Sequence, residues 1–193
     1  KTGIFKYPVA EAIFLGKEDV AKDHVVDRRY HGGADKACYL YATNHYDYWQ
    51  KLYPDLKFEL GMFGENLSIE NLDESKIYVG DIYQLGEAKV QISQPREPCF
   101  KLGARFGSQK VVHQFLKADF PGIYLRVLAE GNVKTGDEML LLESPEKLLT
   151  VLQYYRTLCD KIPDEVSKQN TLNSKFVREK KKEEIIKMTS RHI

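Results

Sequence analysis

Cys99 is the residue of this sequence whose surroundings best suit chemistry. It stands in the run Gln94-Pro95-Arg96-Glu97-Pro98-Cys99-Phe100-Lys101, directly after a segment with strand periodicity. Pro98 has the fixed φ that suits the first position of a helix, so Cys99 is predicted to lie in a first helical turn. The free N–H groups of that turn, together with Arg96 and Lys101, would favour the thiolate, which acts as a nucleophile or binds a soft metal. A buried structural cysteine is the alternative.

A glycine-rich loop with basic neighbours is the second candidate. In the run Asp27-Arg28-Arg29-Tyr30-His31-Gly32-Gly33-Ala34-Asp35-Lys36, two glycines let the backbone come close to a ligand, and Asp35 is the predicted cap of a following helix. Surrounded by Arg28, Arg29 and Lys36, this loop suits an anion such as phosphate. A tight turn with an incidental basic surface would look the same, and a lone histidine such as His31 is more often structural.

The third candidate is the run Gly61-Met62-Phe63-Gly64-Glu65-Asn66-Leu67-Ser68. Its glycines mark a turn, where Glu65 and Asn66 could orient a polar ligand. A hairpin loop held by a capping carboxylate is an equally good interpretation.

Short strands separated by glycine turns must position these residues. Strand patterns cover Ile77–Tyr83, Ala88–Gln94, Gly122–Leu128 and Glu138–Leu142, which is typical of a barrel or a sandwich. Two helices are predicted among them, over Asp35–Leu52 and over Ser108–Lys117, the second capped by Ser108.

The composition changes after Ser144, which predicts a barrel domain over residues 1–144 and a helical appendage over residues 145–193. Pro163 ends the first helix of the appendage and Asp164 begins another. The charged segment after Lys175 is predicted to be a solvated helix face. The appendage is expected to pack through apolar residues at helical spacing: Leu148, Leu152, Tyr155 and Leu158.

The charge balance excludes some partners. The 193 residues carry 29 basic and 28 acidic side chains, a net charge of +1, which argues against coating by nucleic acid and against a membrane-surface role. No apolar run approaches the roughly 18 residues of a membrane span. Cys38, Cys99 and Cys159 stand about sixty residues apart, which fits neither a disulfide framework nor a zinc site. We therefore expect a reduced, cytoplasmic protein in which Cys38 and Cys159 are structural.

Four motifs in order resemble the MOSC domain family, named for the C-terminal domain of molybdenum cofactor sulfurase. They are Arg-Tyr-His-Gly-Gly-Ala-Asp-Lys, Phe-Gly-Glu-Asn-Leu, Val-Gly-Asp-Ile-Tyr and Gln-Pro-Arg-Glu-Pro-Cys-Phe-Lys. The resemblance runs from about Gly3 to about Leu142. The tail is similar to that of the bacterial stand-alone subgroup, the YiiM-like proteins, associated with resistance to N-hydroxylated purines. The resemblance implies a mainly β fold: a MOSC-type β-barrel with interspersed helices and a small C-terminal helical appendage.

The resemblance also implies a cofactor and a site. The family's motif cysteine carries sulfur or ligates molybdenum, and it corresponds to Cys99. Amidoxime-reducing members hold a molybdenum–pterin cofactor, which the basic loops would bind. The residues expected to contact the cofactor are Arg28, Arg29, His31, Gly32, Gly33, Asp35, Lys36, Glu65, Asn66, Arg96 and Lys101. Pyridoxal phosphate is associated with the family as a whole only.

Three functions follow from the resemblance. The first is molybdenum-cofactor-dependent reduction of N-hydroxylated compounds such as purine bases, with Cys99 as metal ligand. Because the sequence has neither a cysteine-ligated iron–sulfur module nor a dinucleotide-binding glycine pattern, a separate reductase would supply the electrons. The second is a sulfur carrier that delivers a Cys99 persulfide to a metal centre, and the third a non-catalytic cofactor-binding module. A second copy of the chain is a further candidate partner.

Overall fold

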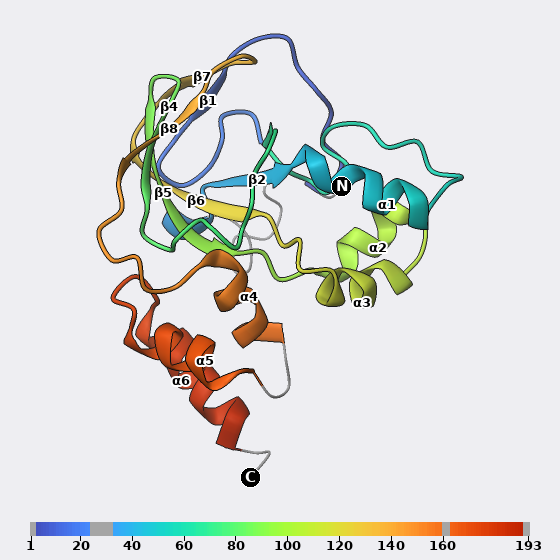
Figure 1. Ribbon diagram of the computed structural model, residues 1–193. Coiled ribbons are helices and arrows are strands. Elements are labelled where there is room, and N and C mark those ends of the chain that lie inside the picture. Colours follow the sequence, from blue (N-terminus) through green and yellow to red (C-terminus); the bar gives the residue numbers. More distant parts are fainter. Residues whose placement is uncertain (1–2, 24–32, 160–162, 191–193) are drawn as a thin grey trace.

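A curled sheet of six strands lies at the centre of the computed structural model, which describes residues 3–23, 33–159 and 163–190 (Figure 1). The strand order is β3-β2-β6-β5-β4-β8, and neighbours are antiparallel except for the parallel pair β2–β3. A two-stranded sheet pairs β1 with β7. The strands are β1 (Ile13–Leu15), β2 (Cys38–Ala42), β3 (Leu67–Ile69), β4 (Ile82–Leu85), β5 (Ala88–Pro95), β6 (Ile123–Ala129), β7 (Gly131–Val133) and β8 (Met139–Glu143).

The curl of the sheet follows from irregular pairing between its two longest strands. The register of β5 against β6 shifts between Lys89 and Val90 and again between Ile92 and Gln94. Each extra residue bends the strand and increases its right-handed twist, so the sheet wraps into a half-barrel. The predicted mainly β, barrel-type fold is confirmed.

The helices form two groups on the sheet (Figure 1). The first group, α1, α2 and α3, lies together on one side, and the second group, α4, α5 and α6, forms the C-terminal end. Two 3-10 turns, η1 and η2, flank β2. The bounds are η1 (Ala34–Lys36), η2 (Thr43–His45), α1 (Tyr46–Leu52), α2 (Phe100–Phe106), α3 (Lys110–Lys117), α4 (Val151–Cys159), α5 (Glu165–Asn173) and α6 (Glu179–Thr189). No helix among the described residues is long and apolar enough to cross a membrane.

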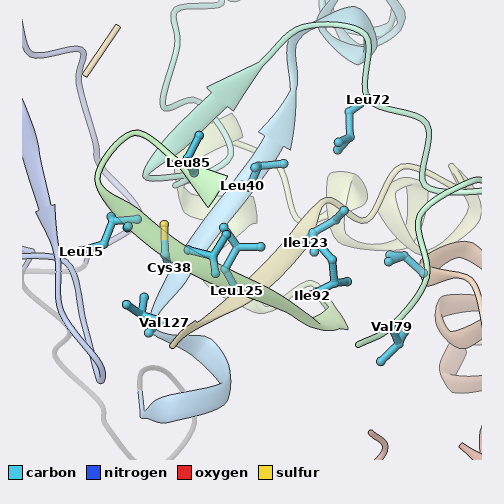
Figure 2. Close-up of a cluster of buried hydrophobic side chains, with 14 of the residues drawn as sticks. Leu15, Cys38, Leu40, Leu72, Val79, Leu85, Ile92, Ile123, Leu125 and Val127 are labelled. Carbon is cyan, nitrogen blue, oxygen red and sulfur yellow. The ribbon is translucent and has the colours of Figure 1, made fainter. Parts of the chain in front are cut away.

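Two apolar cores hold these layers together. The aliphatic core lies inside the curled sheet and includes Leu40, Ile92 and Leu125 (Figure 2). The aromatic core lies between β2 and helices α1–α3, where Trp49 and Phe63 are fully buried. The chain between β5 and α3 passes through the aromatic core, so the segment that carries Cys99 has firmly packed ends.

The C-terminal helices share the aliphatic core of the barrel. Val151, Tyr154, Val177 and Ile185 belong to the same buried cluster as the strands. Tyr155 is buried as predicted and donates to the Phe115 carbonyl, whereas Leu148, Leu152 and Leu158 are half-buried. Leu149, Val151 and Tyr154 are the fully buried residues that this segment adds to the aliphatic core. Helix α6 is mainly exposed apart from Ile185, in keeping with the predicted solvated face. The division at residue 144 stays a prediction.

One predicted helix is largely wrong. The segment predicted as a helix over Asp35–Leu52 contains a strand, β2, and only its last turns form the helix α1. All five residues of β2 are buried because the aliphatic core covers one face of the strand (Cys38, Leu40 and Ala42) and the aromatic core covers the other (Tyr39 and Tyr41). A strand buried on both faces is apolar at consecutive positions, and its periodicity cannot distinguish it from a buried helix.

Smaller corrections concern where elements begin. The predicted strand Ile77–Tyr83 is a turn up to Asp81, because Gly80 has φ 96° and the Phe176 ring fills the space where a side chain would lie. Helix α3 begins at Lys110, and the Ser108 hydroxyl accepts a hydrogen bond from the Lys110 amide, 3.3 Å away, without being the N-cap. Asp164 is the N-cap of α5, as predicted, and accepts from the Ser167 amide at 2.9 Å.

Candidate functional site

The loop between β5 and α2 places Cys99 at the start of a helix. Helix α2 begins at Phe100, so Cys99 is its N-cap in extended conformation and does not lie in the first turn, and Pro98 lies before the helix. This shift by one or two residues corrects the predicted helix start. The Cys99 side chain is half-buried and forms no disulfide. Lys101 follows in the first turn of α2 and is also half-buried.

Arg96 is a buried cation beside Cys99. The side chain is 4 % exposed, its Nη1 donates to the Phe63 carbonyl, and its guanidinium carbon lies 4.8 Å from the centre of the Tyr39 ring. Arg96 also interacts electrostatically with the Cys99 sulfur. The Phe63 carbonyl and the Tyr39 ring offset the cost of burying the guanidinium, but neither carries a negative charge. The positive field of Arg96 therefore still acts on the Cys99 thiol.

The end of the glycine-rich loop lies at the same place. Gly33 has φ 82°, which favours glycine, and it precedes the 3-10 turn that carries Asp35 and Lys36. The Lys36 ammonium lies 5.5 Å from the centre of the Tyr124 ring, and Tyr124 in turn interacts electrostatically with Cys99 and Arg96. Tyr124 therefore connects the two predicted loops. The other predicted residues of this loop lie outside the described residues: Arg28, Arg29, His31 and Gly32.

Asp35 was predicted to cap a helix, and this prediction is wrong. Its carboxylate is buried and accepts a hydrogen bond from Arg126 Nε at 2.7 Å, while Gly33 is the N-cap of the turn. The Asp35 carbonyl oxygen lies 2.5 Å from the Ser93 hydroxyl on β5. These contacts attach the loop to the central strands of the sheet.

Glu65 and Asn66 are both engaged with the chain itself. Glu65 is 3 % exposed and accepts hydrogen bonds from the amides of Gly61 and Phe63, at 2.8 and 3.0 Å, and from the Tyr46 hydroxyl. Burial and this carboxylate raise the pKa of Tyr46. Asn66 accepts from the Tyr39 amide and donates to Asp23. The structure favours the turn-holding interpretation of both residues, and their contact with a cofactor stays a prediction.

The other two cysteines have structural positions. Cys38 lies in β2 inside the aliphatic core with 1 % exposure, and burial raises the pKa of its thiol to about 12 (Figure 2). Cys159 is half-buried at the end of α4, where it interacts with the Tyr155 hydroxyl. The structure therefore leaves Cys99 as the cysteine with charged neighbours on a loop.

Several residues of this site escaped the sequence motifs. Arg126 interrupts the apolar strand β6, and a charged residue within such a strand is a signal that could have been noticed. Tyr124 looks like an ordinary strand tyrosine, and Arg178 and Lys181 stand in the charged tail that was interpreted as a solvated face. Only the folded chain brings them together: Arg178 pairs with Asp35 and Lys181 pairs with Glu97.

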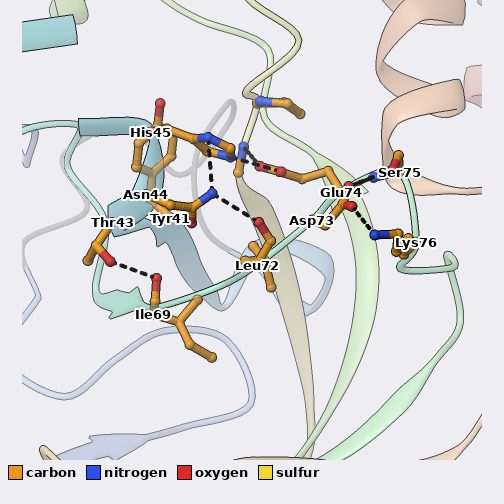
Figure 3. Close-up of polar contacts among 12 residues, drawn as sticks. Tyr41, Thr43, Asn44, His45, Ile69, Leu72, Asp73, Glu74, Ser75 and Lys76 are labelled. Carbon is orange, nitrogen blue, oxygen red and sulfur yellow. Dashed lines mark hydrogen bonds and ion pairs between the residues drawn. The ribbon is translucent and has the colours of Figure 1, made fainter. Parts of the chain in front are cut away.

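A second polar cluster lies away from these residues (Figure 3). His45 Nε2 is 3.0 Å from Glu74 Oε2, and both side chains are buried. The ring of Phe120 stacks on His45 at 4.1 Å, and Glu74 also accepts from the Gly122 amide. The pair lines a cavity of about 300 Å³ that contains none of the predicted site residues. A buried histidine–carboxylate pair of this kind anchors η2 to the turn before β4.

Comparisons with known proteins agree with this fold. The sequence model of the MOSC domain matches residues 27–140, and the chain belongs to the MOSC domain family. It is 39 % identical over 151 residues to the uncharacterized protein YflK of Bacillus subtilis, a match that covers 78 % of this chain and 68 % of YflK. It is 36 % identical over 152 residues to protein YiiM of Escherichia coli, covering 78 % of this chain and 67 % of that protein.

Solved structures extend the likeness to the helical appendage. The crystal structure of YiiM from Geobacillus stearothermophilus matches with a TM-score of 0.82 and 29 % identity, over 97 % of this chain and 89 % of that one.

A further sequence relative is much longer than this chain. A protein of Gibberella moniliformis named "Reductase" is 36 % identical over 132 residues, which are 66 % of this chain and 23 % of that protein. The chain is thus a YiiM-like MOSC protein.

Proposed function

We propose that this protein holds a molybdenum cofactor through Cys99 and reduces N-hydroxylated compounds, N-hydroxylated purine bases among them. The observation that carries the proposal is the half-buried Cys99 on a loop beside a buried cation, Arg96, with Lys36 next to the same tyrosine ring. Membership of the MOSC family and the relative named a reductase support it.

The residues present fit such a cofactor. Among the described residues, no three His, Cys, Asp or Glu side chains come together as a metal site, and Cys99 is the soft ligand that the site loops offer. A single thiolate suits a metal that arrives with the sulfur ligands of its own pterin. Cations beside Cys99 suit the phosphate at the other end of that pterin.

The chain's own residues have distinct roles in this proposal. Cys99 would bind the metal as a thiolate, and the field of Arg96 would favour that ionised form. Lys36 binds the cofactor's phosphate, and Tyr124 packs between the two loops. The bound cofactor supplies the redox chemistry. Two electrons and two protons cleave the N–O bond of the substrate, leaving an N–H group and water.

Electrons come from a separate reductase protein in this scheme. The named reductase relative is much longer than the matched segment, which covers 23 % of it. A partner chain, or an additional part of a longer protein, would supply the same electrons. The minimal experiment therefore provides an artificial donor, so that the site is tested without the partner.

The test is metal analysis of protein purified from a host that makes the cofactor. About one molybdenum per chain and reduction of an N-hydroxylated base are expected, and Cys99→Ser should lose both. Cys159→Ser, the other half-buried cysteine, is the matched control and should keep both. Metal-free protein with labile sulfur on Cys99 would instead indicate a sulfur carrier, and bound cofactor without turnover a binding module. Either result would overturn the proposed reductase.

A further inference from the structure

Cations from three parts of the chain meet beside the Cys99 loop. The Asp35 carboxylate pairs with Arg126 on β6 through one oxygen and with Arg178 through the other. Glu97, two residues before Cys99, pairs with Lys181 on α6 at 2.9 Å. Arg178 and Lys181 both come from the C-terminal helices, so the appendage contacts each of the two predicted site loops.

Lys36 lies between these pairs. Burial and the neighbouring Lys181 and Arg178 lower the pKa of Lys36, while Glu97 and Asp35 act in the opposite direction. Four cations (Lys36, Arg126, Arg178 and Lys181) thus face three carboxylates (Asp35, Glu97 and Glu184). Burial is the largest of these effects, and an anion bound beside Lys36 would favour its ammonium form.

The appendage holds its two cations in a fixed position. Val177 and Ile185, on either side of Arg178 and Lys181 in sequence, are buried in the aliphatic core of the barrel. Arg178 is the N-cap of α6, whose first turn carries the positive end of the helix dipole. The Arg178 side chain is 65 % exposed, so part of its guanidinium remains accessible to a ligand while one nitrogen contacts Asp35.

Carboxylates also face these cations, and they limit the field. Glu184 lies 3.4 Å from Lys181 on the same helix, and Glu179 pairs with Lys182. Arg178 and Lys181 thus lie against Asp35 and Glu97, the carboxylates that stand one residue before Lys36 and two residues before Cys99.

We propose that Arg178 and Lys181 of the C-terminal appendage, together with Lys36, bind a phosphate group of the ligand whose reacting part lies at Cys99. This inference rests on the proposed function for the position of the reacting part and deepens it by assigning half of the phosphate site to the appendage. Arginine binds phosphate through paired N–H donors and lysine through a point charge, so the set provides both.

Two ligands could supply this phosphate: the pterin cofactor, or a substrate in nucleotide form. The chemistry recognised is the same, and the two sources differ in when the phosphate arrives. The cofactor's phosphate would be bound in purified protein, whereas a nucleotide's phosphate would raise the affinity for the nucleotide above that for the free base.

The first arm of the test uses inorganic pyrophosphate as probe and calorimetry on the full chain at low salt. The double variant Arg178→Gln/Lys181→Gln should bind pyrophosphate about tenfold more weakly, or worse, corresponding to the loss of about 1.4 kcal/mol. Lys180→Gln is the control: it removes one positive charge from an exposed neighbouring position on α6 and should change the affinity less than twofold, whereas a diffuse field would weaken binding about threefold per charge. Asp35 keeps Arg126 in the double variant, so no buried carboxylate is left alone.

The outcomes are separable from the proposed function. Cys99→Ser should bind pyrophosphate like the wild type, so this arm can be interpreted even if no molybdenum is found. Failure of the wild type to bind pyrophosphate would overturn the inference, and so would an equal loss per charge in Lys180→Gln, which would indicate a diffuse field.

The second arm identifies the source of the phosphate by pterin content, measured as fluorescence of the oxidised pterin. Loss of pterin in the double variant but not in Lys180→Gln indicates the cofactor's phosphate. Unchanged pterin with weaker binding of an N-hydroxylated nucleoside monophosphate, but not of the base, indicates the substrate's phosphate. If pterin content and nucleotide binding are both unchanged, the assignment of Arg178 and Lys181 is wrong.

Discussion

Replacing Glu65 separates its two interpretations, a structural carboxylate and a cofactor contact. Oε1 of this carboxylate accepts from the Gly61 amide and the hydroxyls of Tyr46 and Ser68, and Oε2 accepts from the Phe63 amide. With a side chain only 3 % exposed, no water replaces these bonds easily. We therefore expect Glu65→Ala to destabilise the fold, whatever happens to the cofactor.

The magnitude follows from the donors that lose their acceptor. Each buried donor left unsatisfied costs about 1–3 kcal/mol, so two buried amides alone give about 4 kcal/mol for Glu65→Ala. At about 2–4 °C per kcal/mol for a protein of this size, the melting temperature should fall by roughly 8–16 °C. Glu65→Gln keeps an acceptor in place of Oε1 but turns an NH₂ group toward the Phe63 amide, which leaves about one donor unsatisfied and costs about 2 kcal/mol.

Thermal melting and urea unfolding measure both variants, with Glu59→Gln as the control. Glu59 lies in the same loop, but its side chain is 42 % exposed and pairs with the exposed Lys57, so its replacement should not change the melting temperature measurably. The structural interpretation would be refuted if Glu65→Ala melted like Glu59→Gln. Unchanged stability with loss of pterin would show that the carboxylate faces the ligand.

Three other measurements test the structure. Burial raises the pKa of the Cys38 thiol from 9.0 to about 12. At a pH between these two values the thiol therefore ionises in the unfolded chain but not in the folded protein. The free energy of unfolding should then fall as the pH rises from 9 toward 12, less steeply in Cys38→Ala, and Cys99 should be alkylated before Cys38 in the folded protein. Breaking the His45–Glu74 pair by Glu74→Ala should cost about 3–5 kcal/mol, and a double-mutant cycle with His45→Ala should show smaller than additive loss. Deleting everything after Ser144 should give aggregated protein, because it uncovers the aliphatic core; a soluble, cofactor-loaded truncation would contradict this.

The strands could be predicted wherever one face of the sheet is more polar than the other. Alternation placed the strand over Ala88–Gln94 within one residue of β5, and the segment Gly122–Leu128 within one residue of β6. It failed at Cys38–Ala42, where both faces are buried and the alternation vanishes. The reason is tertiary: neighbours on both sides of β2 removed the signal on which the method depends.

The residues of the candidate site also fall into two groups, those that local sequence could reveal and those that it could not. The loop that carries Cys99 and the turn that carries Lys36 were recognised because proline and glycine mark their geometry locally. Tyr124, Arg178 and Lys181 could not be recognised, because nothing within a few residues of them distinguishes a site residue from a strand tyrosine or a surface cation. Their proximity depends on pairing across the sheet and on the docking of a helix.

That docking also explains why the loop of Lys36 needs the C-terminal helices. Asp35 is buried, and a buried carboxylate without partners costs several kcal/mol unless it takes up a proton. Arg126 supplies one partner from the sheet, and Arg178 supplies the other from the appendage. Removing Arg178 leaves Asp35 paired but less constrained, so the first consequence should be looser positioning of Lys36 and not unfolding. In the proposed phosphate site the appendage would therefore contribute twice, through its own cations and through the position it gives to a cation of the barrel.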